Sequence, residues 1–408
     1  QYLVFLILPF FLVLDKFELN LKDDSKINLL GIIDIQNILN SDFKISGSNI
    51  TSKNIIKFID NLYSRPDLKV LPEGILNNFN IDYNEGMLKE SSFSYQSNLG
   101  TNISVKGLIK SNNIFDSNLN IELTSTSSEE ILELINNFNF LNKFSKIEFD
   151  QLKINSALNK GLFKIDTLNV IDGESNATIS GEIDIYNKGN RNLEIKLTKF
   201  NQFNLFPFPQ LEEILTSLDT NYIDLDCFLT DTNLEIVNLE IPVSGNSNLY
   251  ITGDVNLKNF KETFLNIKFN DIRPFHIKTI LDQTNQLRYL NYIELINFEE
   301  IQGSIFLDLK ENSTLIDGIK FIQEDNVIGN ISGEISNSQF KGSVNFEKIN
   351  INQLDKKFFK TKRIKGFINV DLVLPNFIST DSYLNIGGTI NGDIEVVISD
   401  DELGLLMF

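Results

Sequence analysis

The side chains that most often carry out chemistry are rare in this chain. Its 408 residues include one His and one Cys, His276 and Cys227. A single His cannot form a multi-histidine metal site, and a single Cys excludes an internal disulfide and a zinc site built from cysteines. His276 follows Pro274 at the expected start of a helix, so we predict a surface or capping role. Cys227 lies in an alternating run, where we predict a small core residue.

Acidic side chains are abundant, but they also lack partners for catalysis. Glu129, Glu130 and Glu133 fall on one expected helix, and Asp400 and Asp401 are adjacent. Neither group has a His or a set of metal ligands at a useful spacing, so both are expected to be solvated. No P-loop, dinucleotide fingerprint or nucleophile elbow occurs. We therefore predict that the protein is not an enzyme, and we predict no cofactor and no metal site.

The composition predicts a folded, acidic protein. Hydrophobic residues make up 42% of the chain and charged residues 22%, which allows a large core. The 36 Lys and Arg against 55 Asp and Glu give a net charge of −19, which disfavours binding to phosphate backbones. Nucleic acid is therefore not expected as a partner.

One short pattern recurs six times: an apolar residue, any residue, Gly, any residue, then Ile or Val. Its glycines are Gly31, Gly107, Gly181, Gly253, Gly333 and Gly388, at intervals of 76, 74, 72, 80 and 55 residues. An isolated copy would mean little, but an interval near 75 kept through four steps indicates an internal repeat. An alternating strand follows each of the first five glycines, and it keeps the same spacing.

These strands are followed by helical patterns. Ser127 and Glu130 form an expected capping box, in which each side chain satisfies a backbone N–H, and apolar residues follow at helical spacing from Ile131 to Phe138. Similar patterns follow Pro209 and Pro274, and weaker ones lie at 55–62 and 354–358. Each repeat therefore contains four or five strands and one helix.

The predicted fold is mainly β with short periodic helices. It is an elongated, repeating β-groove of antiparallel strands, with about five strands plus one helix per unit of roughly 75 residues. Residues 15–362 form five tandem repeats, and 363–408 begin a further module that the sequence truncates. Residues 1–14 are almost wholly apolar but, as a helix, would rise only about 21 Å, too short to span a bilayer. We expect a truncated membrane anchor there, with a buried strand or a cleaved signal peptide as alternatives.

Alternation places one apolar face along the sheet, and the repeated glycines belong to it. This face is either the dry core of a closed sandwich or solenoid, or the lining of an open trough that holds apolar molecules. For the open trough we predict ten lipid-binding residues, which are Ile179, Ile183, Leu193, Ile195, Leu197, Ile251, Val255, Leu265, Ile267 and Phe269.

The repeat, together with the end of the chain, resembles the AsmA-like family of bacterial envelope proteins. The most specific part is the strand that begins Ile364-Lys-Gly366, followed by Leu384-Asn-Ile-Gly-Gly388 and an alternating strand that reaches Asp400. The family usually has Asp-Gly at this last position, whereas this chain has Asp400-Asp401. Members of this family are similar to bridge-like lipid transfer proteins built from repeating β-groove units.

This resemblance implies a protein anchored in the inner membrane and largely periplasmic, in a Gram-negative bacterium. It implies binding of phospholipid acyl chains and their conduction toward the outer membrane in support of outer-membrane assembly, with envelope proteins as partners. Two alternatives come from other classes: a structural surface repeat or adhesin with a closed core, and an outer-membrane barrel. Periodic capped helices and the absence of Trp disfavour the barrel.

Overall fold

The computed structural model describes most of the chain, and the statements below concern only that part. The described residues are 5–8, 11–20, 24–37, 40–54, 72–84, 87–110, 113–137, 148–187, 190–201, 215–216, 218–243, 246–283, 296–336, 339–350, 364–378 and 387–396.

The chain divides into two compact units, each considered by itself. Unit 1 comprises Gln1–Leu205 and Phe228–Asp231, and unit 2 comprises Phe206–Cys227 and Thr232–Phe408. The strands of unit 1 are β1 (Phe5–Leu8), β2 (Phe11–Asn20), β3 (Lys26–Asp34), β4 (Asp42–Thr51), β5 (Gly74–Asn84), β6 (Met87–Ser97), β7 (Asn102–Lys110), β8 (Asn118–Ser125), β9 (Gln151–Asn159), β10 (Leu162–Asp172), β11 (Ser175–Asp184) and β12 (Arg191–Phe200). The strands of unit 2 are β14 (Asn233–Pro242), β15 (Asn248–Asn256), β16 (Phe264–Ile272), β17 (Glu300–Asp308), β18 (Ser313–Gln323), β19 (Asn326–Ser336), β20 (Gln339–Asn350), β21 (Ile364–Ile378) and β22 (Gly387–Val396). Strand β13 (Ile223–Thr230) is divided between the units.

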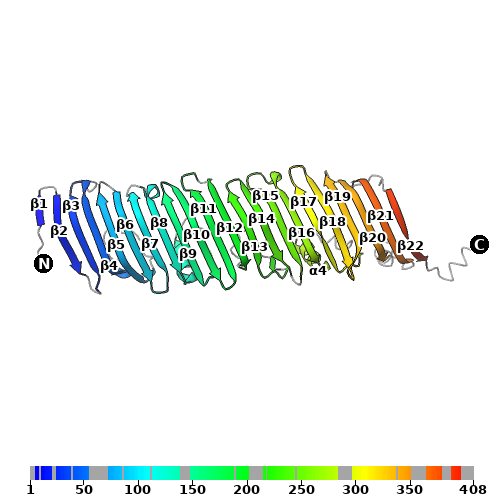
Figure 1. Ribbon diagram of the computed structural model, residues 1–408, viewed down its shortest axis with the longest axis horizontal. Helices are drawn as coiled ribbons and strands as arrows, with labels where there is room; N and C mark the ends of the chain where they lie inside the picture. Colours follow the sequence, from blue (N-terminus) through cyan, green and yellow to red (C-terminus); the bar gives the residue numbers. More distant parts are fainter. Residues whose placement is uncertain are drawn as a thin grey trace, which may run out of the picture. The chain divides into compact units, whose positions relative to one another are not determined.

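Helices are few and short among the described residues. Unit 1 contains the 3-10 helix η3 (Ile114–Asp116) and helix α2 (Ser128–Asn137), and unit 2 contains η5 (Phe260–Glu262) and α4 (Pro274–Gln283). Within each unit the consecutive strands lie side by side in chain order (Figure 1). Strands β1 to β12 pair successively and antiparallel, and so do β14 to β22. The predicted mainly β fold of antiparallel strands with short helices is confirmed.

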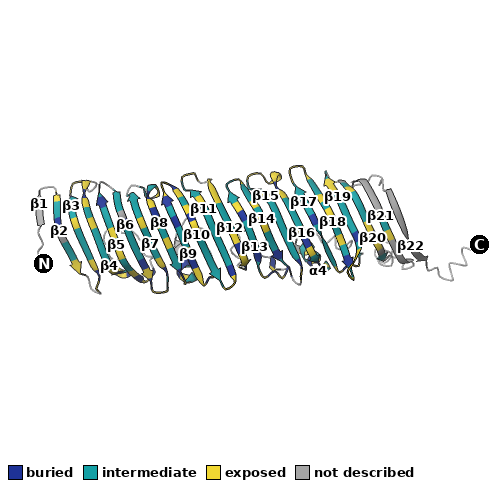
Figure 2. Ribbon diagram, in the orientation of Figure 1, coloured by how far each residue is buried: buried dark blue, intermediate teal, exposed yellow. Residues whose placement is uncertain are grey.

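Side chains alternate between an apolar and a polar face, as the sequence predicted. In β11 and β12, Ile179 lies directly opposite Ile195, and the next pair along, Thr178 with Lys196, faces the other way. We call the side that carries Ile179 in unit 1, and Ile251 in unit 2, the apolar face. Most strand residues are of intermediate exposure, with few buried ones (Figure 2). Within each unit, most described side chains of the apolar face are likewise only partly covered.

The repeated glycines mark a bend that returns every fourth strand. Gly31, Gly107, Gly181, Gly253 and Gly333 lie in β3, β7, β11, β15 and β19, all with φ between 131° and 154°. A Cβ on any of them would lie well inside 3.0 Å of a backbone carbonyl oxygen in the following strand. In each case the preceding strand carries a β-bulge next to the residue that faces the glycine. Glycine and bulge together bend the sheet and increase its twist.

Each interval between repeated glycines contains four strands, where the sequence predicted four or five. From Gly107 to Gly181 these are β8, β9, β10 and β11. The predicted alternating strands after the glycines are β4, β8, β12, β16 and β20. The proposed boundaries of the five repeats, 15–362, and of the module at 363–408 stay predictions.

Hydroxyl groups brace the strand ends at fixed distances from the glycines. Six residues before a glycine stand Ser25, Thr101, Ser175 and Ser247, all buried. Ser25 Oγ donates to the carbonyl of Asn49 (2.7 Å) and Ser247 Oγ to that of Asp271 (2.5 Å). Ten residues after a glycine, Ser41, Ser117 and Thr263 accept the backbone N–H groups of Asp34, Lys110 and Asn256.

Helix α2 forms where predicted, but half of its capping box differs. Ser127 Oγ accepts the Glu130 N–H (3.3 Å), as expected. The Glu130 carboxylate does not return to Ser127, whose N–H instead donates to Ser125 Oγ (3.0 Å). Glu130 is buried and accepts a hydrogen bond from Ser97 Oγ (2.6 Å) on β6. The prediction of a reciprocal box and of a solvated Glu130 is therefore wrong, because a buried strand hydroxyl outcompetes the local N–H.

The first residues of the chain that the structure describes lie in strands. Residues 5–8 form β1 and 11–14 begin β2, and these two strands pair with each other. In the described part of the chain no helix has the length and apolar character needed to cross a membrane. The predicted helices at 55–62 and 354–358, and the residues Leu384, Asp400 and Asp401, lie outside the described residues.

Candidate functional site

The candidate site is a continuous row of apolar side chains that crosses the strands of unit 1. Each member is the direct cross-strand partner of the next. The row runs through Leu76, Tyr95, Ile103, Leu123, Ile154, Leu168, Ile179 and Ile195, one residue from each of the strands β5 to β12. At about 4.8 Å between strands, eight strands give a row roughly 34 Å long. Of its members only Tyr95 is buried, so the other seven offer apolar surface that is partly accessible.

Unit 2 carries a shorter row of the same kind. Leu239, Ile251, Ile267, Ile305 and Ile316 follow one another as cross-strand partners in β14 to β18. All five are partly exposed. Where a strand of the rows pairs on both sides, its backbone groups are engaged in the strand ladders, so the rows offer mainly apolar contact.

The ten predicted lipid-binding residues fall into two groups. In unit 1, Ile179 faces Ile195, Leu193 faces Gly181, Leu197 faces Ala177 and Ile183 faces Arg191. In unit 2, Ile251 faces Ile267, Leu265 faces Gly253, Phe269 faces Leu249 and Val255 faces Leu234. The alternation thus brings together the residues of each group on one apolar face. Arg191, at the edge of this face, places its Nε 4.0 Å from Asp231 Oδ1.

Burial differs along the strands. Leu197 and Phe269 are buried, at 9% and 6% exposure, whereas the other eight predicted residues are half-buried. Leu197 and Phe269 lie toward the strand ends from which the chain leaves β12 and β16, and β16 leads directly into α4. We call this the helix end of the strands and the opposite one the far end.

Helix α2 covers part of the row in unit 1, close to the helix end of the strands. Ile131 of α2 packs with Phe149 and Leu152 in a buried cluster, against which Leu123, Ile154, Leu168 and Val170 are partly buried. Leu123, Ile154 and Leu168 belong to the row. Among the described residues, the helix therefore covers one side of the apolar face, and it packs against part of the row itself.

In unit 2 the helix end is aromatic. Phe298 and Phe321 meet edge to face with ring centroids 5.2 Å apart, and Phe321 is 4.9 Å from Phe346. Helix α4 begins at Pro274, and the buried His276 reaches back with Nδ1 to accept the backbone N–H of Arg273 (3.2 Å). The predicted capping role of His276 is confirmed, and the alternative of a surface position is wrong.

Burial, reinforced by the nearby Arg273 charge, lowers the pKa of His276 below its ordinary 6.5. Its stabilising contribution is therefore complete above about pH 6.5 and is lost as the pH falls toward the folded-state pKa. We expect acidification from about pH 7.5 to about pH 5.5 to lower the melting temperature of the wild type more than that of His276→Gln. The Gln amide oxygen can accept the same N–H without titrating. Equal losses in both proteins, followed by circular dichroism, would contradict this role.

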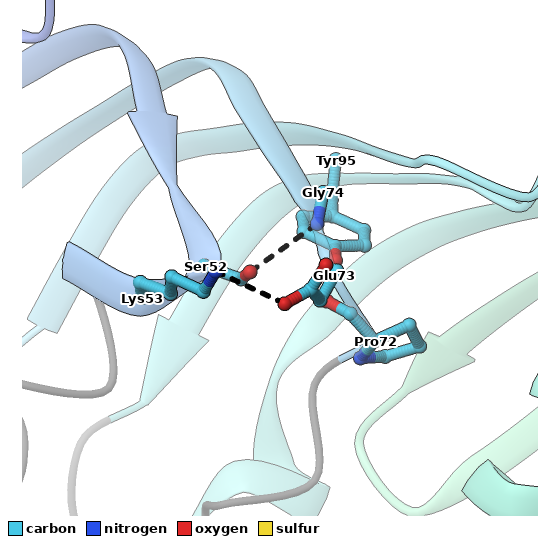
Figure 3. A network of polar contacts seen from close by, with 6 residues as sticks. All are labelled: Ser52, Lys53, Pro72, Glu73, Gly74 and Tyr95. Atoms are coloured by element: carbon cyan, nitrogen blue, oxygen red, sulfur yellow. Dashed lines mark hydrogen bonds and ion pairs between the residues drawn. The ribbon is translucent and has the colours of Figure 1, made fainter. Parts of the chain in front are cut away.

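A polar network ties together the two ends of the connection between β4 and β5 (Figure 3). Ser52 Oγ accepts the Gly74 N–H (3.2 Å), Lys53 Nζ lies 3.2 Å from Glu73 Oε1, and Tyr95 Oη donates to the Pro72 carbonyl. Burial, followed by the Glu130 charge, raises the pKa of Tyr95 to about 12. Tyr95 therefore stays a neutral donor, and its ring is the buried member of the row.

The remaining chemistry-bearing groups show structural roles. Cys227 in β13 is buried as predicted, and burial, with a smaller effect of Asp226, raises the pKa of its thiol to about 11, which disfavours the reactive thiolate. Asp34 and Asp184 each accept two backbone N–H groups in the loop that follows, and these bonds, led by those from Asn37 and Asn187, lower the pKa of both carboxyls. Among the described residues no three His, Cys, Asp or Glu side chains group as a metal site would require.

Sequence reasoning missed part of the row. Of its eight members only Ile179 and Ile195 were predicted. The six others share the same alternation, and they are Leu76, Tyr95, Ile103, Leu123, Ile154 and Leu168. Continuing the alternation across each bulge would have found them, but a bulge shifts the register without a compositional signal.

Comparison with known proteins adds no relative: no family model matches the chain, and neither curated proteins nor solved structures contain a match.

Proposed function

We propose that the apolar face binds the acyl chains of phospholipids and conducts them along the sheet, so that the protein acts as a lipid carrier rather than as an enzyme. The observation that carries this proposal is the row of cross-strand partners from Leu76 to Ile195, of which all but Tyr95 are only partly covered. Flexible alkyl chains need contact with apolar surface and no directional partner, which such a row supplies.

Two features support an open trough over a closed core. In a closed sandwich the inward-facing residues of two sheets bury one another, whereas eight of the ten predicted contact residues remain half-buried. Within each unit the glycine bends recur at every fourth strand, which suits a sheet curled around its apolar side.

We further propose that this carrier works in the Gram-negative envelope, anchored at the inner membrane, largely periplasmic, and moving phospholipid toward the outer membrane with envelope proteins as partners. This part rests on the resemblance of residues 363–404 to AsmA-like proteins. The acidic charge of −19 supports it, because it keeps a protein with an apolar trough soluble.

The test is to purify the protein without detergent and measure bound lipid by native mass spectrometry. We expect phospholipids to copurify with the folded protein, several per chain, because both rows offer sites. A preparation that is folded, stays free of lipid and takes up none from added vesicles would overturn the proposal.

A further inference from the structure

The strand after Gly181 departs from its counterparts at one position of the apolar face. Ten residues after a repeated glycine, three other strands begin with a small hydroxyl residue that accepts a backbone N–H, namely Ser41, Ser117 and Thr263. The corresponding residue of β12 is Arg191. The N–H of Asp184, which such a hydroxyl would accept, donates to the Asn190 carbonyl instead (2.8 Å). The fold therefore does not need Arg191 for this bond, and a departure from a structural pattern is typical of functional positions.

Arg191 lies on the apolar face, at the far end of β12. Its cross-strand partner is Ile183, and Leu193 and Ile195 follow it on the same side of the strand. A second line of direct cross-strand partners leads to Arg191, and it consists of Leu119, Leu158, Phe163 and Ile183. Among the described residues of β8 to β12 nearer the far end, Arg191 carries the only positive charge on the apolar face. A cation thus stands at the edge of this apolar surface.

The guanidinium group of Arg191 keeps free hydrogen-bonding capacity. Its side chain is 44% exposed, and Nε donates to the Thr230 carbonyl (3.4 Å). Asp231 Oδ1 accepts the backbone N–H of Arg191 (2.8 Å) but lies 4.0 Å from Nε, beyond hydrogen-bond distance. Neither terminal nitrogen of Arg191 donates to a described residue. Glu182 and Asp184 on the adjacent strand belong to the polar face. The two terminal nitrogens are therefore open to an anionic ligand.

We propose that Arg191 binds the phosphate of a phospholipid whose acyl chains lie on the apolar face of unit 1, an inference that rests on the proposed lipid carrier. A guanidinium group matches a phosphate because two parallel N–H groups reach two oxygens at once. The lengths also agree. An acyl chain spans about 15 Å, half of the hydrocarbon core of a bilayer, and Ile195 lies about 13 Å along β12 from Arg191. A chain that starts beside Arg191 therefore passes Leu193 and reaches the row.

The surroundings of Arg191 favour a lipid over a soluble phosphate. A soluble phosphate would contact the guanidinium group and leave the apolar side chains beside it exposed to water. A phospholipid also covers Ile183 and Leu193, which are both half-buried in the structure. Removal of this apolar surface from water adds to the charged hydrogen bonds. The aliphatic stem of Arg191 itself suits the boundary between the two parts of the ligand.

A comparison of lipids with and without a phosphate tests the proposal. The full chain, purified without detergent, is offered equal amounts of phosphatidylglycerol and of diacylglycerol with the same acyl chains, and native mass spectrometry measures the species with one lipid bound. We expect the wild type to prefer phosphatidylglycerol about tenfold. Arg191→Gln should lose this preference and still bind diacylglycerol. The control, Lys196→Gln, removes a positive charge from the polar face of the same strand and should keep the preference.

A second variant should change the preference in the opposite direction. In Asp231→Asn the amide oxygen can still accept the Arg191 N–H, but the negative charge beside the guanidinium group is gone, so the preference for phosphatidylglycerol should rise. A weaker preference in this variant, or a folded Arg191→Gln that keeps the preference of the wild type, would overturn the proposal. Displacement of bound phospholipid by glycerol 3-phosphate would assign the site to a soluble phosphate and would overturn it as well.

The outcomes separate this inference from the carrier proposal. Equal binding of both lipids by the wild type would overturn the phosphate site and leave the carrier proposal standing. If the folded protein binds neither lipid, the carrier proposal fails and the phosphate site fails with it.

Discussion

Replacing Ile179 and Ile195 together by Asp is expected to empty the row of unit 1 of phospholipid. The two residues are direct cross-strand partners in the middle of the apolar face, and both are half-buried. Covering an ionised carboxylate with an acyl chain costs several kcal/mol, so bound phospholipid in this unit should fall at least tenfold. Native mass spectrometry of the detergent-free protein measures the change.

The same two strands offer a matched control on the other face. Thr178 and Thr198 lie on β11 and β12 and face the polar side, so Thr178→Asp/Thr198→Asp adds the same charge to the same strands. We expect this variant to keep its lipid and its melting temperature. If the apolar-face variant unfolds the unit while the control stays folded, the apolar face is a closed core and the carrier proposal fails.

The glycine period is the part of the fold that sequence alone predicted best. A glycine with φ near 140° and a carbonyl oxygen close to where a Cβ would lie cannot readily be replaced by another residue, so a glycine recurs in the sequence at every bend. Helices α2 and α4 were predicted equally well, because the apolar spacing of each helix begins directly after its start signal, Ser127 or Pro274.

The hydroxyl groups that brace the strand ends were not predicted. Ser25, Thr101, Ser175 and Ser247 stand six residues before a glycine, yet Ser and Thr are common in turns and strands alike. Their regularity becomes visible only once the chain is aligned on the glycines. The structure shows what one of these hydroxyls does, because the buried Ser247 Oγ donates a hydrogen bond to the Asp271 carbonyl.

The candidate site was predictable as a face but not as a row. Alternation identifies which residues share a side, and it placed Ile179 with Ile195 and Ile251 with Ile267 correctly. Which residues become neighbours across several strands depends on every bulge between them, for instance the shift between Ile165 and Leu168 in β10. Partner register is a property of the assembled sheet, so local sequence does not contain it.

Burial of Glu130 shows how tertiary contacts override a local signal. The Ser-x-x-Glu spacing correctly located the start of α2, because the Ser127 hydroxyl caps the helix. The carboxylate turned instead to Ser97, which is 33 residues away in the chain. Packing of α2 against the apolar face decides where its third residue, Glu130, lies. The cap at the start of the helix is then formed by Ser127 alone.

Substituting Gly181 by Ala is expected to destabilise unit 1 strongly, although it adds only one methyl group. Its φ of +131° is strained for an L-residue, and a Cβ would meet the Asn192 carbonyl oxygen and the Leu193 α-carbon, which belong to backbone and cannot swing away. Strain and overpacking together should lower the free energy of unfolding by about 3 kcal/mol or more. Urea unfolding followed by circular dichroism measures it.

Gly173, eight residues upstream in the turn between β10 and β11, is the matched control. Its φ is +57°, and no heavy atom lies within 4 Å of the position that a Cβ would take. Gly173→Ala therefore meets only the left-handed backbone penalty, about 1 kcal/mol. A difference of about 2 kcal/mol between the variants measures the close approach of β11 to β12 together with the greater backbone strain at Gly181. Equal costs would mean that the sheet relaxes around the added methyl, and the glycines would then not be required for the bend. If the bend does require Gly181, the Ala variant should also retain less phospholipid than Gly173→Ala under conditions where both are folded, because the curvature that shapes the apolar face depends on it.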